Sequence, residues 1–328
     1  MRVLVTGASG YLGRAIVGAL TARGHVAVAF GRSAVASGLA CAAVDGDVRD
    51  ERAVRAAATG CDAICHAAAL VSVWRRRRAE FDEVNVGGLR TVLHVAHLLG
   101  VPRVLYTSSF LALPPTGTEM PQSLNDYQRT KVLADRVATE AVAAGAPLVR
   151  VYPGVIYGPG PMTAGNLVGG MIADHLAGRL PGLVGAARRW SYAFIDDVAG
   201  GHVTALERGR IGERYRLCGE NAPQMRIFEI VRQLTAVPLP RRIPFTAAAA
   251  FALFDQARAR LRGVQPRLTL GTLRILNRDW AFDSDLASRE LDYRITPLTE
   301  GIARVVAEIR EARAAGAARA ARNEHARR

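Results

Sequence analysis

Three glycines separate the first apolar run of the chain from its first amphipathic segment. The apolar run covers residues 2–6, and Gly7, Gly10 and Gly13 follow it at three-residue intervals. Glycine at such places lets the backbone turn tightly and approach a pyrophosphate, whose charge then rests on the N-terminus of the next helix. The chain therefore starts as a strand, a phosphate-binding turn and a helix, which is the start of a dinucleotide-binding α/β fold.

The first half of the chain alternates strand-like runs with amphipathic segments, a pattern typical of a parallel sheet with crossover helices. Strands are predicted near residues 2–6, 25–30, 40–45, 62–66, 103–107 and 148–152, and helices near 11–23, 50–58, 80–99 and 127–145. After Pro153 the rhythm breaks into loops rich in glycine and proline. We therefore predict an α/β fold, a doubly wound parallel Rossmann sheet with a smaller C-terminal substrate-binding portion.

The same pattern predicts how the chain is divided. Residues 1–155 are expected to form the dinucleotide-binding core, with the catalytic groups included. Residues 156–310 are expected to be mainly substrate-binding, with some elements returning to the core, because later segments cover the carboxyl ends of the strands in such sheets. Residues 311–328 have no hydrophobic period and are predicted to be a frayed basic tail.

The formal net charge of +14 raises the question of a nucleic-acid partner. Much of the excess lies in the arginine run 75–78 and in the Ala/Arg-rich segment 310–328. No recognised nucleic-acid-binding motif or aromatic platform accompanies these arginines, so a solvated basic surface and no nucleic-acid partner are predicted. Lys131 is the only lysine of the chain, which makes its position informative.

Composition also bears on the compartment. No stretch reaches the roughly 18 apolar residues of a transmembrane helix, and the start of the chain enters the first apolar run without the pattern of a signal peptide. The four cysteines, Cys41, Cys61, Cys65 and Cys218, have neither metal-ligand nor paired-disulfide spacing. Reduced thiols, no metal site and a cytoplasmic location are the expectations.

Residues after the predicted strands extend the dinucleotide site. A carboxylate after the second strand would bind the ribose hydroxyls and favour NAD, but none is present. Arg32 occupies this place and could bind a 2′-phosphate of NADP, stack on adenine or face solvent. Asp47 could accept a hydrogen bond from the adenine amino group, or belong to a surface turn. The predicted cofactor contacts are Gly7, Ser9, Gly10, Tyr11, Leu12, Gly13, Arg32, Asp47, Val48 and the small residues Ala67, Ala68 and Ala69.

Tyr127 and Lys131 are one helical turn apart and therefore share a helix face. The lysine cation favours the tyrosinate and would lower the phenol pKa, which makes Tyr127 a candidate acid or base. Ser109 follows the fifth strand and could polarise a substrate oxygen, with Ser108 as its rival. Lys131 could also bind the nicotinamide ribose, and Asn85 could support a water that relays protons to it.

The chain resembles the extended short-chain dehydrogenases/reductases. Within that family it is most similar to the dihydroflavonol-reductase-like branch and to farnesol-dehydrogenase-like enzymes. The resemblance spans about residues 1–300 and is carried by the motifs at 66–71, 84–89, 106–110, 152–160, 178–182, 196–198 and 212–215. It implies catalysis by Ser109, Tyr127 and Lys131, and it places Pro153 and Val155 against the nicotinamide. It also implies a homodimer through the helices near 80–99 and 127–145. Because farnesol enzymes are associated with NAD, the choice between NAD and NADP stays open.

Three functions remain in competition. The first is an NAD(P)-dependent oxidoreductase that interconverts an alcohol and its carbonyl on an apolar isoprenoid-, steroid- or flavonoid-like substrate, which Phe245, Phe251, Leu253 and Phe254 could contact unless they are core residues. The second is a nucleotide-sugar epimerase or dehydratase, in which Arg188 and Arg189 would bind a diphosphate. The third is a regulator that senses dinucleotide without turnover, against which the Tyr127/Lys131 pair counts.

Overall fold

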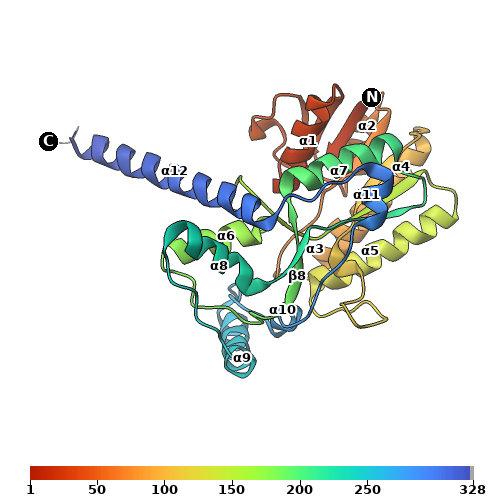
Figure 1. Ribbon diagram of the computed structural model, residues 1–328. Helices are drawn as coiled ribbons and strands as arrows, with labels where there is room; N and C mark the ends of the chain where they lie inside the picture. The colour runs from red at the N-terminus through yellow and green to blue at the C-terminus, as the bar shows by residue number, and fades with distance from the viewer. Residues whose placement is uncertain (326–328) are drawn as a thin grey trace.

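The structure is a computed structural model that describes residues 1–325, and the side chains of residues 1–315. A seven-stranded sheet lies at its centre (Figure 1). In chain order its strands are β1 (Arg2–Thr6), β2 (Val26–Gly31), β3 (Ala42–Asp45), β4 (Ala63–His66), β5 (Val104–Thr107), β6 (Leu148–Pro153) and β9 (Arg214–Leu217). They lie in the order β3-β2-β1-β4-β5-β6-β9, and all neighbours are parallel, which confirms the predicted doubly wound sheet.

Helices cover both faces of this sheet, and for that reason its central strands are mainly apolar, whereas the edge strands β3 and β9 are partly exposed. Along β1 successive side chains point to opposite faces: Val3 and Val5 belong to one core cluster and Leu4 to another. The first cluster includes side chains of α1 (Tyr11–Ala22), α7 (Ile195–Arg208) and α11 (Asp285–Leu291), and the second those of α2 (Glu51–Ala58), α4 (Gly88–Leu98) and α5 (Asp126–Ala143). Figure 1 shows α1 and α7 side by side over the sheet.

The order of the strands reverses between β1 and β4, which are hydrogen-bonded neighbours with Thr6 opposite His66. Connections leave these two strands in opposite directions, so a crevice opens at their carboxyl ends. Gly7 and Ala67 are the residues that follow the two strands. The glycine turn and the small residues predicted to bind the cofactor therefore meet at one point.

The helix predicted near 80–99 consists of three elements. These are α3 (Ala79–Asp82), the π-helical turn η2 (Glu83–Gly87) and α4. Asn85 within the π-turn is buried, and its side-chain amide forms hydrogen bonds with residues outside the helix. A Cβ on Gly88 would come within 2.8 Å of Val48 Cγ2. The glycine pair and the inward asparagine thus explain why a uniform α-helix does not form here; π-turns often occur at functional sites.

A second sheet and five helices form most of the C-terminal portion. The sheet has the order β10-β8-β7, with β7 (Val155–Tyr157) parallel and β10 (Glu220–Pro223) antiparallel to β8 (Arg189–Phe194). The helices are α6 (Leu167–Leu176), α8 (Gln224–Thr235), α9 (Phe245–Arg262), α10 (Leu270–Leu276) and α12 (Leu298–His325), and the 3₁₀ turns of the chain are η1 (Val35–Ser37) and η3 (Phe110–Ala112). Aromatic side chains fill the core here, with the Phe110 and Trp280 rings 5.5 Å apart.

The C-terminal end is helical. The last helix, α12, continues to His325 and extends away from the body (Figure 1), and the predicted fraying beyond residue 311 stays a prediction. Alanine and arginine have high intrinsic helix propensity, so the segment needs no buried face to continue a helix that Ile302 and Val305 have already anchored in the core. Residues 326–328 of the predicted tail lie outside the described residues.

Candidate active site

A cavity of about 1100 Å³ runs along the carboxyl ends of the strands of the large sheet. Its walls contain residues that follow β1, β2, β3, β4, β5 and β6. Every residue predicted to bind cofactor lines it, as do Ser109, Tyr127 and Lys131; the set is Gly7, Ser9, Gly10, Tyr11, Leu12, Gly13, Arg32, Asp47, Val48, Ala67, Ala68, Ala69, Ser109, Tyr127, Lys131, Pro153 and Val155. Among the predicted catalytic and cofactor-binding residues, only Asn85 does not line it.

The glycine turn has the shape that a pyrophosphate site requires. Gly7 has φ of 73°, a conformation that side chains disfavour, and its N–H donates to the Phe30 carbonyl over 2.9 Å. A Cβ on Gly7 would come within 2.7 Å of the Ala68 backbone, and one on Gly13 within 2.1 Å of the Gly7 oxygen. No side chain caps the N-terminus of α1, whose first residues face the cavity, so its free N–H groups suit a phosphate.

The adenosine end of the cavity is basic. Arg32 is exposed there at the end of β2. Asp47 is held by Arg49, whose Nε and Nη2 donate to its two carboxylate oxygens over 2.9 and 2.8 Å, and these bonds lower the Asp47 pKa. Arg49 also reaches Glu83 over 3.0 Å. Sequence reasoning missed Arg49, although its place two residues after a candidate carboxylate was a usable signal.

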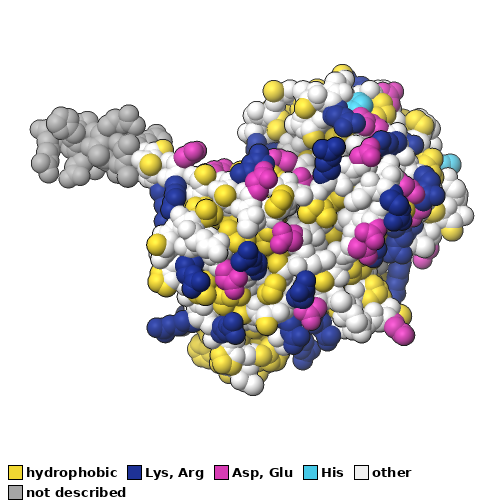
Figure 2. Space-filling model, in the orientation of Figure 1, with side chains coloured by type: hydrophobic (Ala, Val, Ile, Leu, Met, Phe, Trp, Pro, Cys, Tyr) yellow, Lys and Arg dark blue, Asp and Glu magenta, His cyan; other side chains and the backbone are white. Residues whose placement is uncertain are grey.

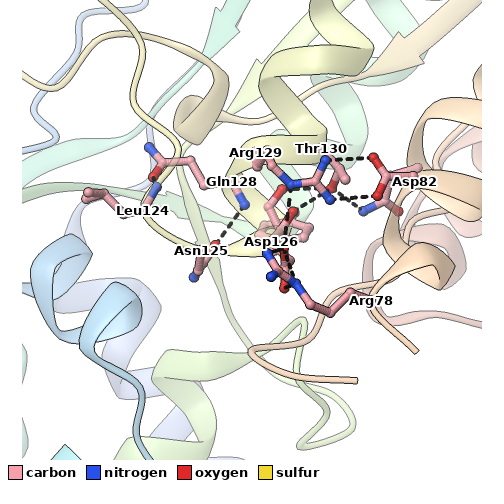
Figure 3. Close-up of polar contacts among 10 residues, drawn as sticks. Arg78, Asp82, Leu124, Asn125, Asp126, Gln128, Arg129 and Thr130 are labelled. Carbon is pink, nitrogen blue, oxygen red and sulfur yellow. Dashed lines mark hydrogen bonds and ion pairs between the residues drawn. The ribbon is translucent and has the colours of Figure 1, made fainter. Parts of the chain in front are cut away.

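Polar contacts fix the start of α5, and with it Tyr127 (Figure 3). Asn125 caps the helix by accepting from the Gln128 N–H over 2.8 Å. The Arg129 guanidinium binds both carboxylate oxygens of Asp82 on α3 over 2.7 and 2.6 Å, and Arg78 binds Asp126 over 2.7 Å. Two ion pairs thus fasten α3 and the preceding Arg78 to α5.

The arginine run is therefore partly structural. Arg77 pairs with Glu83 over 2.7 Å and Arg75 lies 3.9 Å from Glu80, in addition to the contact of Arg78 with Asp126. Exposed ion pairs of this kind contribute little each, and Arg75 and Arg77 also line the cavity. The run orders the rim of the cavity.

Tyr127 is the candidate acid or base. Burial raises the pKa of its phenol to about 12, and the neighbouring Ser109 hydroxyl opposes that rise. The sequence predicts that Lys131 lowers this pKa; in the structure burial outweighs any such effect, and Ser109 is the neighbour that lowers it. Tyr127 is therefore held as a neutral phenol, ready to donate a proton.

Lys131 lies one turn further along α5 and is 3% exposed. Its ammonium donates to the Thr107 carbonyl over 3.1 Å and lies 5.5 Å from the Tyr106 ring centroid. Burial lowers the Lys131 pKa to about 8, and the carboxylate of Asp135 acts in the opposite direction. A buried lysine near neutrality can hold or release a proton, unlike the arginines that this chain uses elsewhere.

Asp135 is a second residue that the sequence reasoning missed. It accepts hydrogen bonds from Tyr152 Oη and, over 3.2 Å, from Arg214 Nη2. Its place one turn after Lys131 was the signal that could have found it. Since it is only 8% exposed, its charge acts on Lys131 with little screening by solvent.

His66 closes the same region on the side of β4. Its Nδ1 lies 2.8 Å from Thr6 Oγ1, its Nε2 has no partner in the described residues, and its ring stacks on Tyr106. Burial lowers the His66 pKa to about 3, and Lys131 adds to this effect. The imidazole therefore stays neutral beside the lysine.

The two candidate serines differ in their surroundings. Ser109 lies beside Tyr127 and caps η3, accepting from the Leu111 N–H over 3.2 Å. Ser108 is directed to Asp135, with 3.5 Å between Oγ and Oδ1. Both line the cavity, and the contact with Tyr127 favours Ser109.

Asn85 holds the loop beneath the cavity. Its Oδ1 accepts from the Leu70 N–H over 2.7 Å, and its Nδ2 donates to Thr130 Oγ1 over 2.9 Å. These bonds tie the segment after β4 to α5. The water relay predicted through Asn85 stays a prediction.

The far wall of the cavity is apolar and comes from distant parts of the chain. It includes Phe110, Leu111, Leu167, Trp190, Ile275 and Leu276. None of Phe245, Phe251, Leu253 or Phe254 lines this cavity, and core packing is wrong for them because they are exposed on α9; their contact with substrate stays a prediction. The sequence showed an apolar cluster but not the direction in which its helix turns.

The two arginines proposed for a diphosphate also lie elsewhere. Arg188 is 3.4 Å from Asp279, and Arg189 donates to the Asn221 carbonyl over 3.0 Å. Neither lines the cavity. Within the described residues no group of three or more metal-binding side chains forms, and no helix there is long and apolar enough to span a bilayer.

Comparison with known proteins agrees with this geometry. Residues 3–218 match the model of the NAD dependent epimerase/dehydratase family. The chain belongs to that family. It is accordingly an enzyme that uses a nicotinamide dinucleotide, and the predicted resemblance to the extended short-chain dehydrogenases/reductases is confirmed.

Individual relatives span nearly the whole chain. Sterol demethylase protein B of Methylococcus capsulatus is 34% identical, over 95% of this chain and 99% of its own. A 4-hydroxy-2-methyl-3-oxo-4-farnesyl-3,4-dihydroquinoline-1-oxide ketoreductase of Stigmatella aurantiaca is 30% identical, over 89% and 92%. The crystal structure of gox2253 superposes with a TM-score of 0.79 at 30% identity, over 94% of this chain and 98% of that one.

Proposed function

We propose that this enzyme interconverts an alcohol and its aldehyde or ketone on an apolar skeleton, with NAD or NADP as the hydride carrier and Tyr127 as the acid or base. The observation that carries the proposal is that Tyr127 lies between two unlike walls of one cavity. One wall is the glycine turn with the small residues after β4, and the other is apolar, with Phe110 and Trp190.

The residues divide the chemistry between them. A dinucleotide bound at the glycine turn would supply or accept the hydride. In the reductive direction Tyr127 donates its phenol proton to the carbonyl oxygen, while the Ser109 hydroxyl donates a hydrogen bond to the same oxygen. Lys131 provides a cation that stabilises the tyrosinate left behind. In oxidation the steps are reversed, and Tyr127, as the tyrosinate that Lys131 stabilises, accepts the alcohol proton.

Two features support an apolar substrate. The wall opposite the glycine turn is built from aromatic and aliphatic side chains, which exclude water from the reacting atoms. The names of two relatives refer to a sterol and to a farnesyl quinoline. Both point to a bulky lipid-like alcohol or ketone.

The second candidate function is a nucleotide-sugar epimerase, which the family name includes. That reaction needs cations near a diphosphate, and only Arg75 and Arg77 are placed to approach the substrate side. The apolar wall counts against it. A regulator without turnover fits less well, because it has no need of Tyr127 and Lys131 together at the cavity.

A substrate panel tests the proposal. Purified enzyme is mixed with NAD or NADP and with farnesol-like alcohols, sterols, flavanone-type ketones or nucleotide sugars, and the absorbance of the reduced nicotinamide is followed. We expect turnover with an apolar alcohol or ketone and none with nucleotide sugars. Epimerisation of a nucleotide sugar without net cofactor reduction would replace the proposal by the second candidate. The cytoplasmic location and the homodimer remain predictions.

A further inference from the structure

An apolar face without a partner lies on α9. Eighteen large hydrophobic side chains are exposed among the described residues, and six of them fall between positions 245 and 264. They are Phe245, Phe251, Leu253, Phe254, Leu261 and Val264, with Phe254 68% and Leu261 89% exposed. Scattered exposed hydrophobics are normal, but such a gathering on one helix marks an interaction surface.

Residues of α9 fall on two opposite sides of the helix, one buried and one exposed. Ala248, Ala252, Asp255 and Ala259 are buried and attach α9 to the protein. The same spacing, shifted by two positions, falls on the opposite side of the helix. The residues there are all exposed: Ala250, Phe254, Ala257 and Leu261. Leu253 adjoins this outward stripe. The helix therefore turns small residues inwards and its large apolar residues to the solvent.

The surroundings of the stripe are basic. Arg260 and Arg262 flank it on the helix, and Arg241, Arg242 and Arg267 are exposed in the adjoining segments. The only acidic residue of α9, Asp255, is buried and binds Arg258 and the backbone of Leu268. The outward face thus combines apolar side chains with positive charge and has no carboxylate. Figure 2 shows the hydrophobic gathering at the end of the molecule where α9 lies, with basic side chains beside it.

This face is coupled to the cavity. Gln256 of α9 accepts from the Leu270 N–H over 2.8 Å, which joins it to the start of α10. On α10, Thr272, Ile275 and Leu276 line the cavity, and so does Gln265 in the connecting loop. Whatever binds the outer side of α9 lies next to the apolar wall of the active site.

From these observations we infer that α9 docks onto the surface of an anionic lipid bilayer, lying in its interface with Leu253, Phe254 and Leu261 inserted. In-plane helices of this kind combine an apolar face with basic flanks that meet anionic head groups. A second copy of the chain is a poorer occupant, because a two-fold contact would set the same arginines of both copies against each other. The docking does not depend on the proposed reaction, but it would deliver a lipid-like substrate to the cavity.

Vesicle flotation tests the inference with the full-length enzyme. The probes are vesicles of phosphatidylcholine alone and vesicles of phosphatidylcholine and phosphatidylglycerol in equal parts. We expect binding to the anionic vesicles, and a loss of about tenfold or more in the double variant Phe254→Ser/Leu261→Ser, because two large side chains no longer insert. The matched control Val35→Ser/Ile211→Ser removes two side chains that are 61% and 55% exposed elsewhere, and it should bind as the wild type does.

A second pair of variants tests the charge. Arg260→Gln/Arg262→Gln should weaken binding to anionic vesicles about thirtyfold, since each of the two basic residues near the surface contributes about 1 kcal/mol of attraction. Cofactor affinity, measured by fluorescence, should be unchanged in all these variants, which shows that they are folded.

Absence of binding to anionic vesicles would overturn the inference, as would equal loss in the Val35/Ile211 control. Sedimentation velocity without lipid tests whether a second copy of the chain occupies this face. If the wild type is a dimer, the Phe254/Leu261 variant is a monomer and neither binds vesicles, the face belongs to a second copy. A failure of the substrate panel would leave the flotation result unaffected.

Discussion

The two walls of the cavity are built in different ways. The cofactor wall comes from a single stretch, residues 7–155, and its glycines and small residues stand at the ends of parallel strands, where the backbone lies close to the cavity. The substrate wall collects side chains from η3, α6, β8 and α10, which are far apart in the chain. A wall of backbone depends on glycines and strand order, whereas a wall of side chains depends on how distant helices pack. The first is therefore readable from local motifs and the second is not.

Tyr127 and Lys131 lie where the walls meet. Their helix is held from the cofactor side by Asn85, which bonds Thr130, and by the contacts of Asp82 and Asp126. Changes on the cofactor wall should therefore alter dinucleotide binding, changes on the substrate wall should alter only the substrate KM, and changes between them should alter the chemical step.

Gly13→Ala should produce the largest effect on the cofactor wall. The added Cβ would meet the Gly7 oxygen at 2.1 Å, so the turn must shift, at a cost of roughly 1–3 kcal/mol in the free energy of unfolding. Dinucleotide binding, followed by fluorescence titration, should be lost. Gly18→Ala on the same helix is the control: nothing lies within 4 Å of its added Cβ, and it should be about 0.5–1 kcal/mol more stable with normal binding. Normal binding by the Gly13 variant would show that the turn does not hold the pyrophosphate.

Arg32→Ala tests the choice of dinucleotide. If the guanidinium meets a 2′-phosphate, affinity for NADP should fall about 10–100-fold and affinity for NAD should barely change. Arg55→Ala, an exposed arginine of α2 outside the cavity, is the matched control. Equal losses for both dinucleotides would remove Arg32 from cofactor selection.

Leu276→Ala tests the substrate wall. Loss of this partly buried side chain should raise the KM of an apolar substrate about tenfold, while dinucleotide affinity stays unchanged. Leu234→Ala on α8, which lies outside the cavity, should leave both constants as they are. A change in dinucleotide affinity would mean that the two walls are not independent.

Asp135→Asn should have the smallest effect of these substitutions, and the quantity that it should change is the Lys131 pKa. Burial lowers that pKa from 10.5 to about 8 and the Asp135 carboxylate opposes the shift, so its removal should lower the pKa further. Because Lys131 is the only lysine, carbon-13-labelled lysine gives one titrating NMR signal. A rise in the pKa, or no change, would exclude the carboxylate as a partner of the lysine.

The sign of the linkage is also testable. A lysine with a lowered pKa binds fewer protons in the folded state than in the unfolded state between pH 8 and pH 10.5. Its unfavourable contribution is complete below pH 8 and disappears as the pH rises towards 10.5, so this group alone increases the free energy of unfolding over that range. Comparing denaturant unfolding of the wild type and Lys131→Met at several pH values isolates the contribution.

The cofactor wall could be predicted from the sequence because its motifs are local. The strands β1 to β6 lie within about two residues of their predicted places, and Gly7, Gly10 and Gly13 occupy the turn that their spacing predicted. Sequence reasoning missed Asp135 and Arg49, whose roles depend on neighbours brought together by folding. It also misjudged Phe251 and Phe254, because hydrophobicity does not tell which side of α9 faces the protein. The helical course of the chain beyond residue 311 was not predicted, because the reasoning considered burial and ignored helix propensity.

The most direct test of the account is the comparison of Tyr127→Phe with the wild type in dinucleotide affinity and in turnover of the substrate that the panel identifies. The substitution removes one hydroxyl and leaves the packing of the ring in place. We predict that turnover falls by about a hundredfold or more while dinucleotide affinity changes little. Turnover equal to that of the wild type would contradict the assignment of Tyr127 as the acid or base.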